Sequence, residues 1–171
     1  VNQVSEILEI KQQTGIAIKG LHLHTGSEIK DLEVFISGLQ LMLDLSKQFE
    51  GLTVIDLGGG FKVPYKPGET GTDISLLASS IARSKNVFEA ESGRHLQLWF
   101  EPGKFLVSEC GILLVRVNVV KQTLATVFAG VDSGQNHLIR PMFYDAYHHI
   151  VNISNPEGKQ RIYSVVGYIC E

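Results

Sequence analysis

Three short segments of this sequence carry side chains that could do chemistry, and each directly follows an apolar run. They are His24-Thr25-Gly26-Ser27, Gly58-Gly59-Gly60 and Glu101-Pro102-Gly103-Lys104. In parallel α/β folds, ligands bind at the carboxyl ends of strands, where loops converge and helix N-termini point inward. Because all three segments follow candidate strands, the sequence predicts that they line one ligand pocket.

The triple glycine suits an anion. Residues without a Cβ can turn several backbone N–H groups toward one point and so form an anion-binding nest of amides. Phosphate is the usual ligand of such a nest. A tight strand-to-helix turn is the alternative interpretation of Gly58, Gly59 and Gly60. Neither the dinucleotide spacing nor the Walker pattern is present, so the loop does not indicate a nucleotide. Ser27 could donate its hydroxyl to the same phosphate or stabilise its own turn.

His22 and His24 lie two residues apart, so a regular strand would point both toward one face. One interpretation is a metal pair, but it needs further ligands, and no other strand end supplies a His or Cys. The other interpretation is a pair of histidines satisfied by ordinary hydrogen bonds.

Glu101 ends an apolar run, where a carboxylate is costly unless a cationic or proton-donating group accompanies it. A ring nitrogen that must stay protonated would be such a group. A salt bridge to a nearby lysine, or capping of a helix, is an equally open interpretation.

The last quarter of the chain holds a second set of polar candidates. Arg140 and Tyr144 lie four residues apart in an irregular segment. Arginine is the side chain best shaped to bind a carboxylate through two parallel hydrogen bonds. Cys170 and Glu171 follow an apolar run, and the thiol is either a proton donor or an inert core residue.

The elements that must position these residues change in kind near Gly111. Before it, helices alternate with short apolar strands, which is typical of a parallel sheet buried on both faces. After it, apolar and polar residues alternate with a two-residue period, as in antiparallel strands of an all-β domain. We expect helices at 3–13, from Asp31 on and at 73–92, and strands at 16–24, 52–57, 95–100, 111–123, 125–132 and 162–169.

Composition excludes several classes of protein. The chain has 171 residues, 44% of them hydrophobic, which rules out intrinsic disorder. A net charge of -3 with no basic block argues against nucleic acid or an anionic membrane as a partner. No apolar run approaches the ~18 residues of a membrane span. Two cysteines cannot form a disulfide scaffold, so a cytoplasmic location is expected.

Taken in order, the segments HTGS, DLGGGF, EPGK, VDSGQNHLIRPMFYDAYHHI and VGYICE resemble the diaminopimelate decarboxylases. That family belongs with the ornithine and arginine decarboxylases among the pyridoxal-phosphate enzymes. The resemblance implies an alanine-racemase-like (β/α)8 TIM-type barrel, the fold type III of these enzymes, followed by an all-β domain. On this basis, residues 1–109 are the second half of the barrel and residues 110–171 begin the β domain.

The resemblance also implies roles for the barrel residues. His24 stacks on the cofactor ring, Ser27 and the glycine loop bind its phosphate, and Glu101 pairs with its pyridine nitrogen. Pro102 and Gly103 contact the cofactor. Lys104 stands where the family usually has arginine, which contacts both the phosphate region and the substrate.

In the β domain, the resemblance assigns substrate carboxylate binding to Arg140 and Tyr144, proton donation to Cys170, and recognition of the distal ammonium group to Glu171. The last two residues would reach the active site of a second subunit, so a homodimer with shared active sites is expected.

The activity implied is decarboxylation of meso-2,6-diaminopimelate to L-lysine and CO2 with pyridoxal 5'-phosphate, the last step of lysine biosynthesis. A related decarboxylase of ornithine, arginine or carboxynorspermidine is the alternative. Two further classes stay open: a metal-dependent barrel hydrolase using His22 and His24, and a binding homologue without catalysis.

Two departures from the family pattern affect this expectation. No lysine lies in the context of the family's Schiff-base lysine, and only three barrel-type strands are expected where eight are needed. We therefore expect an incomplete part of the enzyme, lacking the first half of the barrel and the end of the β domain, and inactive by itself.

Overall fold

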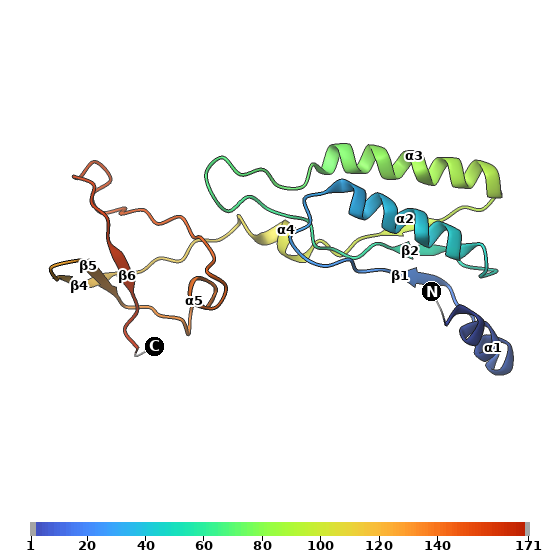
Figure 1. Cartoon of the computed structure of the whole chain (residues 1–171), viewed down its shortest axis with the longest axis horizontal. Helices are drawn as coiled ribbons and strands as arrows, with labels where there is room; N and C mark the ends of the chain where they lie inside the picture. The colour runs from blue at the N-terminus through green and yellow to red at the C-terminus, as the bar shows by residue number, and fades with distance from the viewer. Residues whose placement is uncertain (1–2, 170–171) are drawn as a thin grey trace. The chain divides into compact units, whose positions relative to one another are not determined.

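A three-stranded parallel sheet forms one layer of the first part of the chain (Figure 1). In this computed structural model, which describes residues 3–169, its strands are β1 (Gly20–His22), β2 (Val54–Asp56) and β3 (Gln97–Trp99), in that spatial order. The strands are shorter than the apolar runs that predicted them, because only three residues of each run pair in the ladder. The predicted parallel pairing is confirmed.

Three helices accompany the sheet: α1 (Val4–Thr14), α2 (Leu32–Ser46) and α3 (Ile74–Ser92). The side chain of Asp31 accepts a hydrogen bond from the amide of Glu33 and begins α2, as predicted. Asp73 begins α3 in the same way, through the amide of Leu76. Both helices begin where a side-chain carboxylate satisfies an amide that has no partner within the helix.

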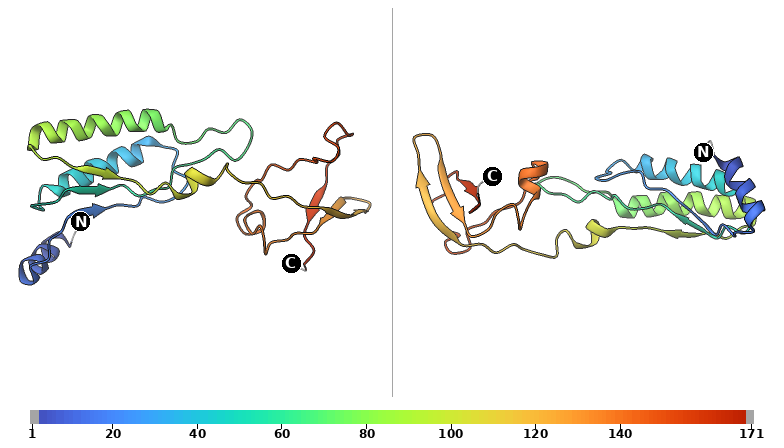
Figure 2. Two further views of the ribbon diagram at one scale, coloured as in Figure 1. Left: turned by 180° about the vertical axis from the view of Figure 1, so that it is seen from behind. Right: turned by 90° about the horizontal axis from the view of Figure 1, so that it is seen from below.

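Helices α2 and α3 lie side by side over one face of the sheet (Figures 1 and 2). The core between them and the sheet includes Leu39, Ile55 and Leu96, which have no exposed surface. The other face is not covered within residues 3–169: His22 is exposed, and so is Trp99 at 54%. The expectation of a sheet buried on both faces is therefore correct for one face only, because the described helices pack on that face alone.

Contacts at the start of β3 fix the strand that leads to Glu101. The carboxylate of Glu89, near the end of α3, accepts hydrogen bonds from Lys85 Nζ (2.6 Å) and from the amide of Leu96 (2.9 Å). These two bonds, the first being the stronger influence, lower the pKa of the Glu89 carboxyl below its ordinary value. Arg94 donates to three backbone carbonyls, that of Ser46 at the end of α2 and those of Phe49 and Leu52 in the connection to β2.

The second part of the chain contains β4 (Val117–Gln122), β5 (Val127–Val131) and β6 (Ser164–Val166). Strands β4 and β5 pair antiparallel, as predicted, but β6 pairs parallel to β5. The expectation of antiparallel pairing is wrong for β6. A long connection leads from β5 to β6 and returns the chain in its original direction, which is how parallel neighbours are joined.

Two short helices form where the sequence predicted only turns or loops. They are α4 (Gly103–Val107), directly after β3, and α5 (Arg140–Tyr144), between β5 and β6. By contacts the chain divides into two units. The first comprises the residues up to Pro64 together with Thr70–Cys110, and the second comprises Tyr65–Glu69 and the residues from Gly111 on. No helix within residues 3–169 has the length and apolar character needed to cross a membrane.

Candidate functional site

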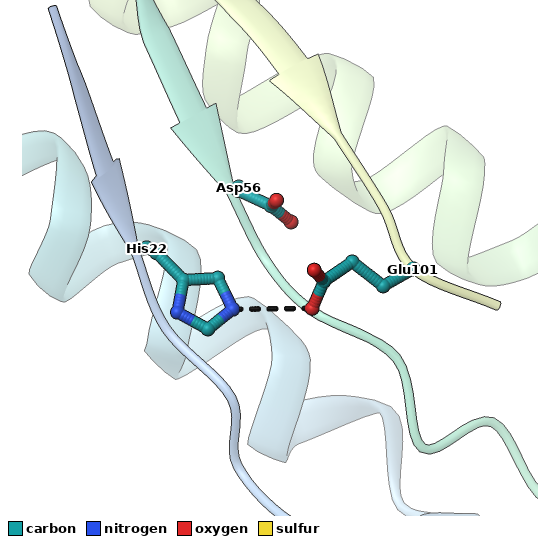
Figure 3. A group of neighbouring side chains, drawn as sticks. All are labelled: His22, Asp56 and Glu101. Carbon is teal, nitrogen blue, oxygen red and sulfur yellow. Dashed lines mark hydrogen bonds and ion pairs between the residues drawn. The ribbon is translucent and has the colours of Figure 1, made fainter. Parts of the chain in front are cut away.

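Side chains from three successive strand ends meet on the open face of the parallel sheet (Figure 3). His22 Nε2 lies 3.1 Å from Glu101 Oε2, and one ligand atom from each of His22, Asp56 and Glu101 lies within 4.8 Å of the others. An ionised carboxylate only accepts hydrogen bonds, so the bond requires a proton on Nε2 of the histidine. The side chains of His22 and Glu101 are 55% and 57% exposed, so the group is accessible from solvent.

The strand register explains this meeting. His22 stands opposite Asp56, and Asp56 stands opposite Trp99, in the parallel ladder. Beyond the end of β3 the backbone stays bonded to the segment after β2, since the amide of Glu101 donates to the carbonyl of Gly58 (2.9 Å). The side chain of Glu101, two residues after Trp99, therefore still reaches the face that carries His22 and Asp56. Residues far apart in sequence therefore reach one face through regular backbone pairing.

Sequence reasoning missed Asp56. Its signal is its position: it is the polar residue that ends the predicted strand at 52–57, at the place where His22 and Glu101 end theirs.

The glycine loop packs tightly against the two neighbouring strand ends. A Cβ on Gly59 would lie 2.1 Å from the carbonyl oxygen of Glu101, and a Cβ on Gly60 would lie 2.0 Å from that of Gly26. The backbone of Gly60 also has a positive φ of 89°. The loop needs glycine both for its conformation and for the approach of three backbone segments.

Hydrogen bonds decide which groups of this loop are available to a ligand. The amide of Gly58 donates to Asp56 Oδ1 (2.9 Å), and that of Gly59 donates to His24 Nδ1 (3.4 Å). Within residues 3–169, neither the amide of Gly60 nor the hydroxyl of Ser27 makes a protein hydrogen bond. Of the three amides in the predicted anion nest, only that of Gly60 is therefore available to a ligand. The hydroxyl of Ser27 is the second available donor.

The structure does not form the candidate metal pair of His22 and His24. The ring of His22 lies against Glu101, whereas that of His24 faces the amide of Gly59. The two rings differ in direction because β1 ends at His22, so the strict alternation of a strand does not extend to His24. The group that could hold a cation contains one histidine and two carboxylates instead.

An ion cluster lies beside the glycine loop, and sequence reasoning missed two of its members. Lys104 Nζ pairs with Glu28 Oε1, and Lys62 Nζ lies 3.9 Å from Glu28 Oε2. Glu28 directly follows the segment His24–Ser27, which is the only signal in the sequence that could have drawn attention to it. The other residues of the Glu101 turn, Pro102 and Gly103, lead into α4.

In the second unit, Arg140 lies over two tyrosine rings. Its guanidinium carbon is 5.4 Å from the ring centroid of Tyr65 and 5.8 Å from that of Tyr144. Such stacking uses the face of the guanidinium and leaves its N–H edges for a planar acceptor such as a carboxylate. Tyr65 was not predicted from the sequence. The predicted Cys170 and Glu171 lie outside the described residues.

The residues of the first unit fit pyridoxal phosphate in two respects. Ser27 and Gly60 offer donors beside a loop in which glycine is required, as a phosphate group needs. Glu101 offers an exposed carboxylate already oriented by a histidine, as a protonated ring nitrogen needs.

Comparison with known proteins gives a consistent result. Residues 1–108 match the family described as "Pyridoxal-dependent decarboxylase, pyridoxal binding domain". The chain is 34% identical to the diaminopimelate decarboxylase of Methanothermobacter thermautotrophicus over 99% of the chain and 41% of that protein. It therefore spans about two fifths of the length of such a relative.

Solved structures agree. A crystal structure of diaminopimelate decarboxylase superimposes with a TM-score of 0.88 and 30% identity, over 99% of this chain and 42% of that one. The enzyme from Helicobacter pylori complexed with L-lysine gives a TM-score of 0.84 and 29% identity, over 99% and 41%. The predicted fold is confirmed: a segment of a (β/α)8 barrel of the fold type III class, followed by β structure.

Proposed function

Because this chain belongs to the family of pyridoxal-dependent decarboxylases, we propose that it is part of an enzyme that converts meso-2,6-diaminopimelate to L-lysine and CO2. The relative at 34% identity carries that activity in its name, and a solved structure of similar fold is complexed with the product, L-lysine. The related ornithine, arginine and carboxynorspermidine activities are less favoured. The structural likeness to a lysine/ornithine decarboxylase of Vibrio vulnificus, at 22% identity, supports the fold alone.

The observation that carries the proposal is the placement of the Glu101 carboxylate. It lies beyond the end of β3, next to His22 and Asp56, on the exposed face of the sheet. Pyridoxal phosphate, when bound, supplies an electron sink for the electron pair left at Cα after CO2 departs. Glu101 would keep a proton on the pyridine nitrogen by charge attraction, which is an electrostatic role and requires no bond-making.

The remaining barrel residues would bind and orient the cofactor. Ser27 and Gly60 would donate hydrogen bonds to the phosphate, and Gly58 and Gly59 would give the loop its close packing. His24, exposed after β1, would stack on the ring.

The turn after β3 completes this set. Pro102 and Gly103 would contact the cofactor. Lys104 would place a positive charge near the phosphate of the cofactor and would also contact the substrate.

Substrate binding is assigned to the second unit. Arg140, with its N–H edges available, and Tyr144 would bind the substrate carboxylate. Cys170 would donate a proton at Cα, and Glu171 would bind the distal ammonium group. The proposal includes a homodimer with shared active sites, on the basis of the family resemblance, and a cytoplasmic location, on the basis of the cysteine content.

The test uses the natural full-length protein and its Glu101→Gln variant. We expect the wild type to release CO2 from meso-2,6-diaminopimelate in preference to ornithine, arginine and carboxynorspermidine. The variant should bind the cofactor but lose about 10²-fold in kcat, since a neutral amide no longer favours the protonated ring nitrogen. Turnover of another substrate alone would refute the substrate assignment, and an undiminished variant would refute the role of Glu101.

A further inference from the structure

The loop after β1 and the first turn of α4 are joined by an ion pair. Lys104 Nζ contacts Glu28 Oε1, and Lys62, which follows the glycine loop, brings its Nζ to 3.9 Å from Glu28 Oε2. The three side chains are between 21% and 39% exposed, so solvent screens them less than it screens fully exposed pairs. One carboxylate thus connects two lysines from different strand-end loops.

The backbone at Glu28 supports a specific role for that carboxylate. Its φ is 60°, a left-handed conformation that a residue with a Cβ adopts at a cost in free energy. The next residue is fixed on both sides: the amide of Ile29 donates to the carbonyl of Gly60 (2.8 Å), and its carbonyl accepts from Thr72 Oγ1 (2.6 Å). These hydrogen bonds hold the backbone on the C-terminal side of Glu28, and the Glu28 carboxylate lies against Lys104 and Lys62.

We propose that Glu28 is a positioning residue for phosphate binding: it fixes the ammonium group of Lys104 beside the donors of Ser27 and Gly60. This inference rests on the proposed function, in which those donors bind the phosphate of the cofactor. A lysine ammonium is a point charge on a flexible stem, whereas an arginine fork is planar and preorganised. A carboxylate partner restricts the stem of Lys104 and so compensates for the absence of arginine at this position.

A simpler role for Glu28 predicts the opposite result. If it were only a counter-charge, it would weaken anion binding, because it reduces the charge of the two lysines by one. Removing it would then strengthen phosphate binding. If it positions Lys104, removing it weakens phosphate binding, and only while Lys104 is present. The sign of the effect separates the two roles.

The experiment measures the dissociation constants of pyridoxal 5'-phosphate and of pyridoxal, by absorbance titration of the natural full-length protein stripped of cofactor. The ratio of the two constants reports the contribution of the phosphate, and a general loss of structure would weaken both ligands alike. The variants are Glu28→Gln, Lys104→Met, the double variant, and Glu33→Gln as a control for an exposed acid nearby. A further variant combines Glu28→Gln with Lys104→Arg.

We expect Glu28→Gln to reduce the preference for the phosphorylated ligand about tenfold, and the double variant to lose no more than Lys104→Met alone, since coupled residues are not additive. Arginine at 104 should restore part of the preference without Glu28, and Glu33→Gln should change nothing. Two results would overturn the inference while leaving the proposed function intact. One is an unchanged or increased preference in Glu28→Gln, and the other is a loss in the double variant equal to the product of the losses in the two single variants. A wild type without preference for the phosphorylated ligand would overturn both.

Discussion

His22, Asp56 and Glu101 come from three strand ends and meet because the ladder between the strands is regular. In the proposed function Glu101 has the chemical task, and His22 is in hydrogen-bond contact with it and can orient it. The histidine holds one carboxylate oxygen at 3.1 Å, which leaves the other oxygen to a ligand. Asp56 has another partner: its Oδ1 accepts a hydrogen bond from the amide of Gly58, and this bond connects the cluster to the glycine loop.

At the residue scale, we predict that His22→Phe lowers kcat/KM about fivefold in the full-length enzyme. The substitution keeps an aromatic ring but removes the nitrogen that orients Glu101, and a half-exposed hydrogen bond to a carboxylate contributes about 1 kcal/mol. Steady-state decarboxylation assays measure the effect. His95→Phe is the matched control, because His95 pairs with Glu89 at the opposite end of β3. Equal losses in the two variants would contradict an orienting role for His22.

At the scale of the elements, the site depends on three loops whose backbones touch. Glycine is required where they meet, as the carbonyl oxygens of Glu101 and Gly26 occupy the space that a Cβ on Gly59 or Gly60 would fill. The strands orient the side chains at their carboxyl ends, and the loops that follow carry the hydrogen-bond donors. Capping by Asp31 and Asp73 begins the helices that pack behind the sheet, and this packing keeps the strand ends in register.

We predict that Gly60→Ala lowers the free energy of unfolding by about 3 kcal/mol, because the new methyl group forces two backbone segments apart. Gly93→Ala is the control. Gly93 also has a positive φ, of 66°, but nothing lies within 4 Å of an added Cβ, so the cost is about 1 kcal/mol for the left-handed backbone alone. Urea unfolding of the two variants gives the comparison. Similar losses would show that backbone conformation, and not loop packing, is what requires glycine at position 60.

At the scale of the whole molecule, the chain combines a barrel segment with β structure, and it spans about two fifths of its relatives' length. The proposed function names residues of both units. The metal-hydrolase alternative is not favoured, because residues 1–108 match the pyridoxal-dependent decarboxylases. A requirement for a resident ion can still be tested on the complete enzyme.

We predict that treating the full-length enzyme with a chelator, followed by gel filtration, leaves decarboxylation unchanged. One histidine and two carboxylates, of which that of Glu101 is exposed, form a weak set for zinc, which favours four nitrogen or sulfur ligands in closed sites. Elemental analysis of the purified protein accompanies the assay. Stoichiometric zinc or iron, lost together with decarboxylation and restored by adding the ion, would contradict this prediction.

Local features of this protein could be predicted from its residues alone. The aspartates that begin two helices act on amides two or three positions ahead, so their effect is visible in a short stretch of sequence. The same holds for the strand ends with His24, Gly58 and Glu101, whose order and spacing also indicated the family. Strand lengths were overestimated, since apolar character extends beyond the residues that pair.

Contacts between distant residues were decided by the tertiary structure. Asp56 and Glu28 entered the site only through it, the first by strand register and the second by a left-handed turn beside a hydrogen-bonded segment. The turning of His24 away from His22 and the parallel pairing of β6 belong to the same class. The physical reason is common to all of them: loop geometry and register depend on contacts made far along the chain, and no short pattern of residues encodes these.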